Sequence, residues 1–238
     1  MRLRFAVALS LALCAGCTPP FGNNSTGNLF SDSRSGALAR DVTVTIATSS
    51  ANPCSASWDG QPVTPAQITE RGIALVERAI AAAGGIQNLT ETSFPVPNVE
   101  APADLSFACA DTILFALQRS GIASVRLKPA GGQVPALADF PLDMNLPAPP
   151  IPMVLGIGAG GQMTWNNDPI DAAGLAAVLG RHGSTGPSEA REGEVPPGGM
   201  EVRVAREATF GQVYELLRTT SRYHLRPFLF LPSTPAGT

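Results

Sequence analysis

The chain carries one pattern twice, and this internal repeat constrains the fold more than any single motif does. Trp58 corresponds to Trp165 at an offset of 107 residues. Further along, residues 99–129 correspond to residues 202–232 at an offset of 103, and the two segments align without a gap. A repeat of this length predicts two copies of one small structural module rather than one large domain.

Both copies carry the same order of predicted elements: a strand, a hairpin turn, a strand, a helix, a strand, a helix and a last strand. Asp59-Gly60 and Asn166-Asn167 occupy the turns, because these residue types tolerate a positive φ. We therefore expect an α+β fold of two tandem ββαβαβ modules at residues 41–129 and 153–232, each a small mixed sheet with two helices. A proline-rich linker at residues 130–152 is expected to join them.

Helix starts are marked by side chains that can satisfy free backbone N–H groups. Thr64 with Gln67, and Thr209 with Gln212, each have the spacing of a capping box. Ser106 holds the place of Thr209 in the first copy and is the expected N-cap there. These signals predict the starts of three of the four helices.

The N-terminus has the features of a bacterial export signal. Arg2 and Arg4 precede an apolar core at residues 5–13 that is too short to span a bilayer. The core ends in Ala15-Gly16-Cys17, which resembles a lipobox, where the cysteine is acylated and becomes the new N-terminus. Residues 1–17 are therefore expected to be a lipoprotein signal peptide that ends at the lipidated Cys17. An ordinary signal peptide is the alternative.

Acyl chains on Cys17 would anchor the protein in a membrane, because their buried methylenes supply the affinity. Thr18 follows this cysteine, where an aspartate would retain such a protein at the inner membrane. We therefore expect the protein in the cell envelope, at the outer membrane and facing the periplasm. Residues 18–40, rich in Gly, Ser and Asn, are expected to form a flexible tether.

Two further cysteines, Cys54 and Cys109, both lie in the first copy. Disulfides persist in the compartments that exported proteins reach. A disulfide between the two is therefore favoured over two free thiols. The second copy has Gly161 and Gln212 near the equivalent positions.

Two segments of the second copy resemble the periplasmic domain of the ExbD/TolR biopolymer-transport family. Residues 163–170 are similar to the family's hairpin, in which a strand is followed by Asn/Asp-Gly and Pro-Val. Residues 202–213 are similar to its entry into the last helix, Val-x-Ile-x-Ala-Asp followed by an aromatic residue, Gly-x-Val. Glu207 holds the acidic position of this motif, and Asp104 holds it in the first copy. The resemblance covers most of both modules.

This resemblance implies a module that dimerises and contacts either energy-transducing partners or the cell wall. Two such modules in one chain are expected to pair as an internal pseudo-dimer. The family's N-terminal transmembrane helix, with its proton-carrying aspartate, has no counterpart, because the early apolar segment is the leader. We therefore do not expect coupling to a proton gradient.

Catalytic, metal and cofactor sites are not indicated by the sequence. His182 and His224 lack the converging Cys/His ligands of a zinc site, and no Gly-x-Ser-x-Gly elbow is present. The glycines of residues 156–161 are spaced like a dinucleotide-binding loop, but a predicted strand follows them where a helix N-terminus is needed. A net charge of −3 without a basic stripe argues against nucleic acid. We therefore expect that the protein is not an enzyme and that it binds no metal and no cofactor.

Four side chains near the turns and helix starts are candidates for a functional role. Trp58 and Trp165 flank the hairpin turns and are either packing residues or exposed aromatic anchors for a partner. Asp104 and Glu207 each precede a helix, where the helix dipole stabilises negative charge. A role as general acids is the alternative for these two carboxylates.

These observations favour a lipid-anchored envelope protein that binds without catalysis. The expected partner is an envelope transport protein or peptidoglycan, contacted through the hairpin tips or through strand edges that accept an added strand. A structural subunit of an envelope assembly is one alternative. An unrecognised periplasmic hydrolase is the alternative from another class.

Overall fold

Buried and partly exposed side chains alternate along the strands, as in a sheet with one covered face. In β1 (Thr43–Ala47), Val44 and Ile46 are fully buried, whereas Thr43 and Thr45 are partly exposed. The computed structural model describes residues 42–48, 54–90, 93–132, 134–140, 153–183, 199–223 and 225–231. All of these residues belong to one compact unit.

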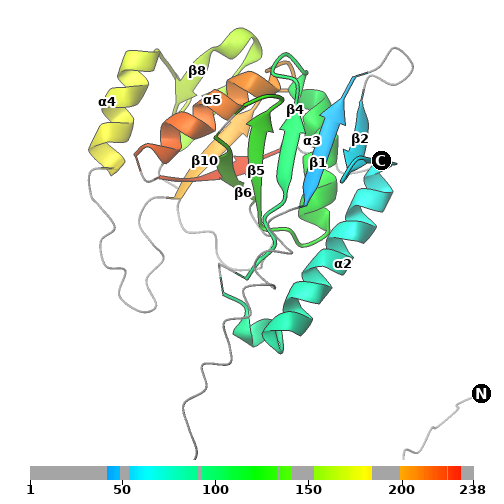
Figure 1. Ribbon diagram of the computed structural model, residues 1–238. Coiled ribbons are helices and arrows are strands. Elements are labelled where there is room, and N and C mark those ends of the chain that lie inside the picture. Colours follow the sequence, from blue (N-terminus) through cyan, green and yellow to red (C-terminus); the bar gives the residue numbers. More distant parts are fainter. Residues whose placement is uncertain are drawn as a thin grey trace, which may run out of the picture. The chain divides into compact units, whose positions relative to one another are not determined.

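The fold is α+β, as predicted, with four α-helices and eleven strands among the described residues (Figure 1). The first half of the chain contains β1, β2 (Ser55–Trp58), β3 (Gln61–Val63), α2 (Pro65–Ala83), the short 3-10 helix η1 (Ile86–Asn88), β4 (Asn98–Ala101), α3 (Phe107–Arg119) and β5 (Ser124–Pro129). A single strand, β6 (Ala136–Asp139), follows. The second half contains β7 (Val154–Ile157), the 3-10 helix η2 (Ala159–Gly161), β8 (Met163–Trp165), β9 (Asp168–Ile170), α4 (Ala172–Gly183), β10 (Gly199–Val204), α5 (Phe210–Ser221) and β11 (Arg226–Phe230).

All eleven strands form one mixed sheet in the order β3-β2-β1-β4-β5-β6-β11-β10-β7-β8-β9. Outward from β6, the strands of the first half follow in the order β5, β4, β1, β2, β3, and their counterparts in the second half follow in the order β11, β10, β7, β8, β9. The pairing pattern of one half therefore repeats in the other. Within each half the three inner strands are parallel and the two outer ones add as antiparallel neighbours. β6 is antiparallel to β5 and parallel to β11.

The segment expected to be a linker thus contributes the central strand of the sheet. Ala136 and Ala138 are buried, and Pro135 stands directly before the strand, where its missing N–H breaks no ladder bond. A four-residue strand with two alanines has little β-propensity of its own, so its neighbours in the sheet determine its conformation. A further difference is that three strands, not two, precede the first helix in each half.

Both hairpin turns adopt the left-handed backbone that their residue types predict. Asp59 and Gly60 have φ values of 49° and 79°, and Asn166 and Asn167 have 52° and 74°. Two consecutive positive φ angles define the type I′ turn, whose twist matches that of the flanking strands. The glycine-rich residues 158–161 form the loop between β7 and β8, and a strand follows them, as expected.

The predicted capping boxes are also present. Thr64 and Gln67 cap α2, and Thr209 and Gln212 cap α5, through reciprocal side-chain and backbone hydrogen bonds. Ser106 stands at the N-cap of α3, but its side chain accepts no capping bond. Its Oγ instead donates to the backbone oxygen of Arg206, 3.2 Å away and in the other half.

A disulfide joins Cys54 to Cys109, which confirms the predicted pairing. Their Cα atoms are 5.3 Å apart, and the bond ties the start of β2 to the first turn of α3. The equivalent pair in the second half is also in contact, because a Cβ added at Gly161 would lie 2.9 Å from Gln212 Nε2. Each half therefore has this contact within itself, and in the first half it is a covalent bond.

Candidate partner-binding surfaces

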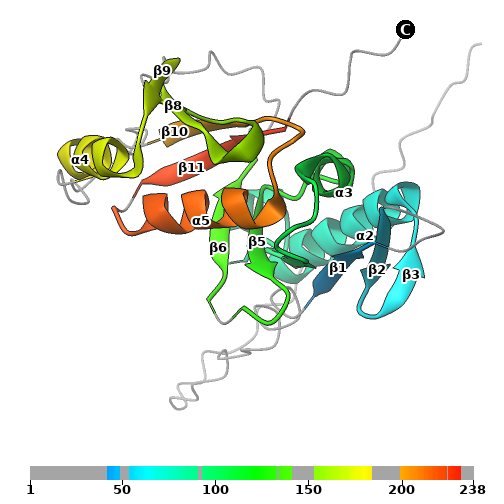
Figure 2. The same cartoon turned by 90° about the horizontal axis from the view of Figure 1, so that it is seen from above.

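The two halves meet where the N-termini of α3 and α5 lie side by side (Figure 2). The backbone N–H of Phe107 donates to the oxygen of Ala208 over 2.7 Å, and that of Phe210 donates to the oxygen of Leu105 over 2.8 Å. The first N–H groups of a helix have no partner within it. Each half therefore satisfies donors at the start of the other half's helix.

A second pair of hydrogen bonds repeats this exchange one residue further along. Ala108 N donates to Arg206 O over 3.1 Å, and Gly211 N donates to Ala103 O over 2.8 Å. Both donors and both acceptors are related by the 103-residue offset of the repeat. The junction is therefore reciprocal, like the contact across a twofold axis in a homodimer.

Asp104 and Glu207 lie in the two loops that cap the opposite helices. Both side chains are exposed, and neither stands in the first turn of a helix. The backbone oxygens of their neighbours, Ala103 and Arg206, are the atoms that accept the helix N–H groups. The backbone of these loops, and not the two carboxylates, accepts the hydrogen bonds from the opposite helices.

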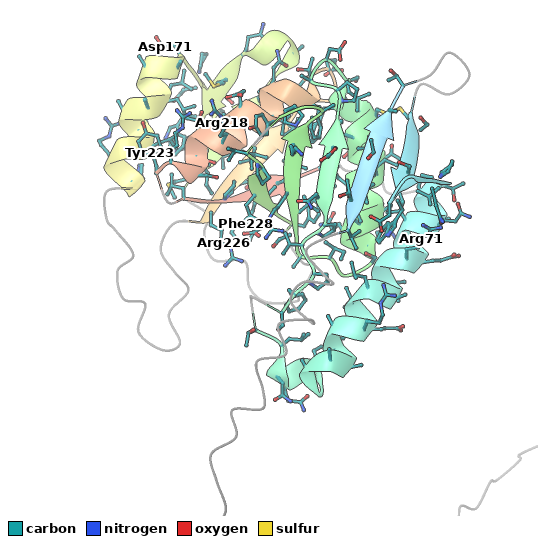
Figure 3. All side chains as sticks on the ribbon, viewed as in Figure 1. Arg71, Asp171, Arg218, Tyr223, Arg226 and Phe228 are labelled. Atoms are coloured by element: carbon teal, nitrogen blue, oxygen red, sulfur yellow. A yellow bond between two sulfur atoms is a disulfide. The ribbon has the colours of Figure 1, made fainter. Side chains whose placement is uncertain are left out.

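A buried carboxylate, Asp139 of β6, links the halves at the middle of the sheet. Its side chain is 3% exposed. Ser124 Oγ of β5 donates to Oδ1, and Arg226 Nε of β11 donates to Oδ2. Arg226 and Phe228, which follow each other on one side of β11, are labelled in Figure 3. The hydrogen bonds of Asp139 therefore reach both halves.

A second buried carboxylate, that of Asp111 in α3, lacks a hydrogen-bond partner at one of its oxygens within the described part of the chain. Its residue is 5% exposed, and Oδ1 has no hydrogen-bond partner among the described residues. Burial raises the pKa of Asp111 to about 6, and the charge of Arg206 from the other half partly opposes this shift. The equivalent position holds Tyr214, whose hydroxyl donates to Val134 O over 2.7 Å. The sequence interpretation missed Asp111, although an aspartate one turn after Phe107 on an apolar face was a visible signal.

The two tryptophans occupy equivalent strand positions but differ in exposure. Trp58 is 6% exposed and belongs to the hydrophobic core, so the exposed-anchor interpretation is wrong for this residue. It pairs with Val44, and the even side of β1 faces the core. Trp165 is partly exposed, packs against the same core, and has its ring centroid 5.8 Å from that of His182 in α4.

The hairpin tips are exposed, and their side chains hold the turns to the neighbouring strand. Asp59 Oδ1 accepts from Thr43 N over 2.9 Å, and Asn166 Oδ1 accepts from Val154 N over 2.9 Å. The backbone returns the bond in each case, from Asp59 N to Thr43 O and from Asn166 N to Val154 O. These turns are therefore polar, exposed and conformationally fixed.

The outer edges of the sheet are poor templates for an added strand. β3 and β9 have three residues each, and Pro62 and Pro169 stand at their centres. Pro62 pairs with Ser57, and this pair comes one step after the hydrogen-bonded pair next to the turn. The backbone groups of Pro62 therefore point away from β2, and its nitrogen faces the open edge. Proline has no N–H to offer there, and short edge strands with proline are a known protection against edge pairing.

Cys17, with the expected signal peptide and tether before residue 41, lies outside the described residues, and so does His224. Within the described part of the chain, no group of three or more His, Cys, Asp or Glu side chains is placed to hold a metal ion. No helix in that same part has both the length and the apolar character needed to cross a membrane. Comparison with protein-family models, with curated proteins and with solved structures finds no match for this chain.

Proposed function

We propose that this chain is a lipid-anchored envelope protein that binds, without catalysis, an envelope transport partner or the cell wall through its two hairpin tips. The observation that carries the proposal is the pair of equivalent, exposed type I′ turns at the two ends of one sheet. A rigid exposed turn loses little conformational freedom on binding, so more of its contact energy appears as affinity.

The resemblance to ExbD/TolR periplasmic modules supports this proposal through the same hairpin. The reciprocal hydrogen bonds between Leu105–Ala108 and Ala208–Gly211 support the further proposal that the halves act as an internal pseudo-dimer. Two tips on one chain give bivalent attachment to a repetitive surface, for which the second contact is effectively intramolecular.

Site-specific photocrosslinking in cells tests the binding role. A photoreactive amino acid replaces Gln61 or Asp168, the exposed residues that follow each turn, and a matched control replaces the exposed Glu77 of α2. We expect adducts with an envelope protein or with peptidoglycan from the two tip positions and not from the control. Equal adducts from all three positions, or none from the tips, would contradict the proposal.

The anchor is tested separately. Metabolic labelling with a fatty acid is expected to mark the wild-type protein and to miss the Cys17→Ala variant. Label retained in the variant would show that the acylated residue is not Cys17. This result would leave the photocrosslinking outcome informative, because the tips act independently of the anchor.

A further inference from the structure

The first half contains a helix, α2, that is longer than the strands beside it. α2 begins after Val63, which lies level with Ile46 near the end of β1, because Ala56 pairs with both residues. The 19 residues of α2 measure about 28 Å, whereas the five residues of β1 measure about 16 Å. The last two turns of α2 therefore extend past the start of β1, as Figure 1 shows.

Burial along α2 agrees with this comparison of lengths. The buried residues of the helix are Ile68, Gly72 and Leu75, and no residue of α2 after Leu75 is buried. Residues 76–83 therefore form the part of the helix that extends beyond the sheet. We call residues 79–86, which comprise the end of this part and the turn that follows it, the α2 tip.

The α2 tip is exposed, yet its side chains are apolar. Its sequence is Ala-Ile-Ala-Ala-Ala-Gly-Gly-Ile, without a charged or polar side chain. Ile86 is 69% exposed, and Ile73, two turns before Ile80 on the same side of α2, is 42% exposed. Lys or Arg near the end of a helix interacts favourably with its last carbonyl groups, but the last turn of α2 carries no basic residue. This composition favours an apolar environment over water.

Hydrogen bonds close the backbone at the tip, as an apolar environment requires. Gly84 has a φ of 76° and donates from its N–H to Ala81 O, and Gly85 N donates to Ile80 O over 2.9 Å. Asn88 Nδ2 donates to Gly84 O over 3.3 Å. A helix that ends in this way loses less free energy on leaving water than one whose last carbonyl groups are free.

The tip lies at the end of the sheet where the chain enters it. Val42, the first described residue, directly precedes β1, and the tip extends past the start of this strand. Cys17 and Val42 are 25 positions apart, and a flexible chain of this length has a root-mean-square reach of about 25–30 Å. A membrane that holds Cys17 is therefore within reach of the tip.

We propose that the α2 tip contacts the lipid surface in which the protein is anchored, with Ile86 at the boundary between headgroups and acyl chains. Lipid is the apolar surface that the anchor keeps next to this end of the protein. The contact needs little affinity of its own, because the anchor makes it effectively intramolecular. The equivalent helix α4 has 12 residues, with Arg181 and His182 in its last turn, so its described residues offer no such tip. This inference rests on the proposed anchor at Cys17.

Fluorescence quenching on vesicles tests this inference. The mature full-length chain is coupled through Cys17 to a maleimide lipid in phosphatidylcholine vesicles that also carry a lipid with a spin label near its headgroup. A fluorescent amino acid replaces Gln87, next to the tip, or Ala66 in the first turn of α2 as the matched control, and both residues are exposed. We expect quenching at position 87 and not at position 66. Ile86→Glu should abolish the quenching at position 87 and leave the Tm unchanged, because Ile86 is 69% exposed.

No quenching at position 87, equal quenching at both positions, or quenching that survives Ile86→Glu would overturn the proposal. An emission shift at position 87 that grows with protein concentration in the absence of vesicles would identify a second copy as the occupant and would also overturn it. Chemical coupling replaces acylation in the cell, so the vesicle result is separate from the fatty-acid labelling. Loss of the fatty-acid label would refute the proposed anchor, whereas loss of quenching would refute the contact of the tip.

Discussion

Arg226 donates from Nε to Oδ2 of Asp139, and this contact holds the second half of the chain to the central strand. The carboxylate is 3% exposed and the guanidinium 44% exposed. The pair is thus buried on one side and open on the other. Without Arg226, the Asp139 carboxylate would keep the hydrogen bond from Ser124 and lose the one to its other oxygen.

Arg226→Ala is expected to lower the free energy of unfolding by about 1–3 kcal/mol, because a buried charged acceptor loses its partner. Arg218→Ala is the matched control, since Arg218 pairs with Glu215 on the surface at 2.9 Å, and such pairs contribute about 0–1 kcal/mol. Urea denaturation of both variants measures the difference. Equal losses would show that burial of Asp139 adds nothing to the pair.

Gly211→Ala is expected to disturb the junction between the halves. An added Cβ would lie 2.8 Å from Ala103 O and 3.0 Å from Ala103 Cβ, both on the opposite half. Such overpacking costs about 1–3 kcal/mol. Gly180→Ala in α4 is the control, because its nearest neighbour would be 3.8 Å away and alanine in a helix gains up to about 1 kcal/mol. Opposite shifts in Tm are expected, and a stable Gly211→Ala variant would contradict the tight junction.

Asp111 should make stability depend on pH. Its pKa rises from 3.8 unfolded to about 6 folded, so the folded state binds the proton more tightly. The contribution of Asp111 to the free energy of unfolding is then fully present below pH 4 and is lost as pH rises through about 6. The loss amounts to about 3 kcal/mol at about 1.4 kcal/mol per pKa unit.

Asp111→Asn should remove this contribution and raise stability at pH 7 relative to wild type. Denaturation midpoints of wild type and variant between pH 4 and pH 7 measure the effect. Asp104→Asn, at the exposed residue of the nearby loop, is the control and should leave the wild-type profile in place. Parallel profiles for wild type and Asp111→Asn would show that Asp111 does not titrate in this range.

Replacing Cys54 and Cys109 by alanine together is expected to lower the free energy of unfolding by about 2–4 kcal/mol, because the cross-link restricts the unfolded chain. The bond closes a sequence separation of 55 residues. Reductant should destabilise the wild type by a similar amount and leave the double variant unchanged. A reductant effect on the double variant would point to a different target.

Asn167→Gly should stabilise the second hairpin. Asn167 has a φ of 74°, and glycine holds the same place in the first hairpin, at Gly60 with 79°. Because glycine meets no Cβ penalty in the left-handed region, a gain of up to about 1 kcal/mol is expected. Thermal unfolding measures it, and a lower Tm would show that the asparagine side chain matters more than its backbone.

Local chemistry made several features predictable from the sequence. Asp59-Gly60 and Asn166-Asn167 could be assigned because positive φ is tolerated by few residue types, and Thr64 and Thr209 because a capping box has fixed spacing. The disulfide between Cys54 and Cys109 could be predicted because exported proteins reach compartments where disulfides persist, and because these are the two cysteines outside the expected leader. Each of these inferences needs only residues close in sequence or rare in the chain.

The features that were missed depend on pairing between distant segments. β6 is a strand because β5 and β11 hold it, and Ala136–Asp139 has little strand character alone. The burial of Trp58 depends on which side of the sheet receives the helices. The side-chain cap expected from Ser106 is replaced by backbone oxygens about 100 residues away. No local pattern contains this information.

The exchange of caps between the halves also sets an order in time. A chain is made and folds from its N-terminus onward, and residues 105–108 appear 103 residues before their partners at 208–211. Until the later segment arrives, the first turn of α3 keeps N–H groups that only water can satisfy. The first half can therefore complete its folding only after the second half has been made, because residues 206–208 supply the acceptors for the start of α3.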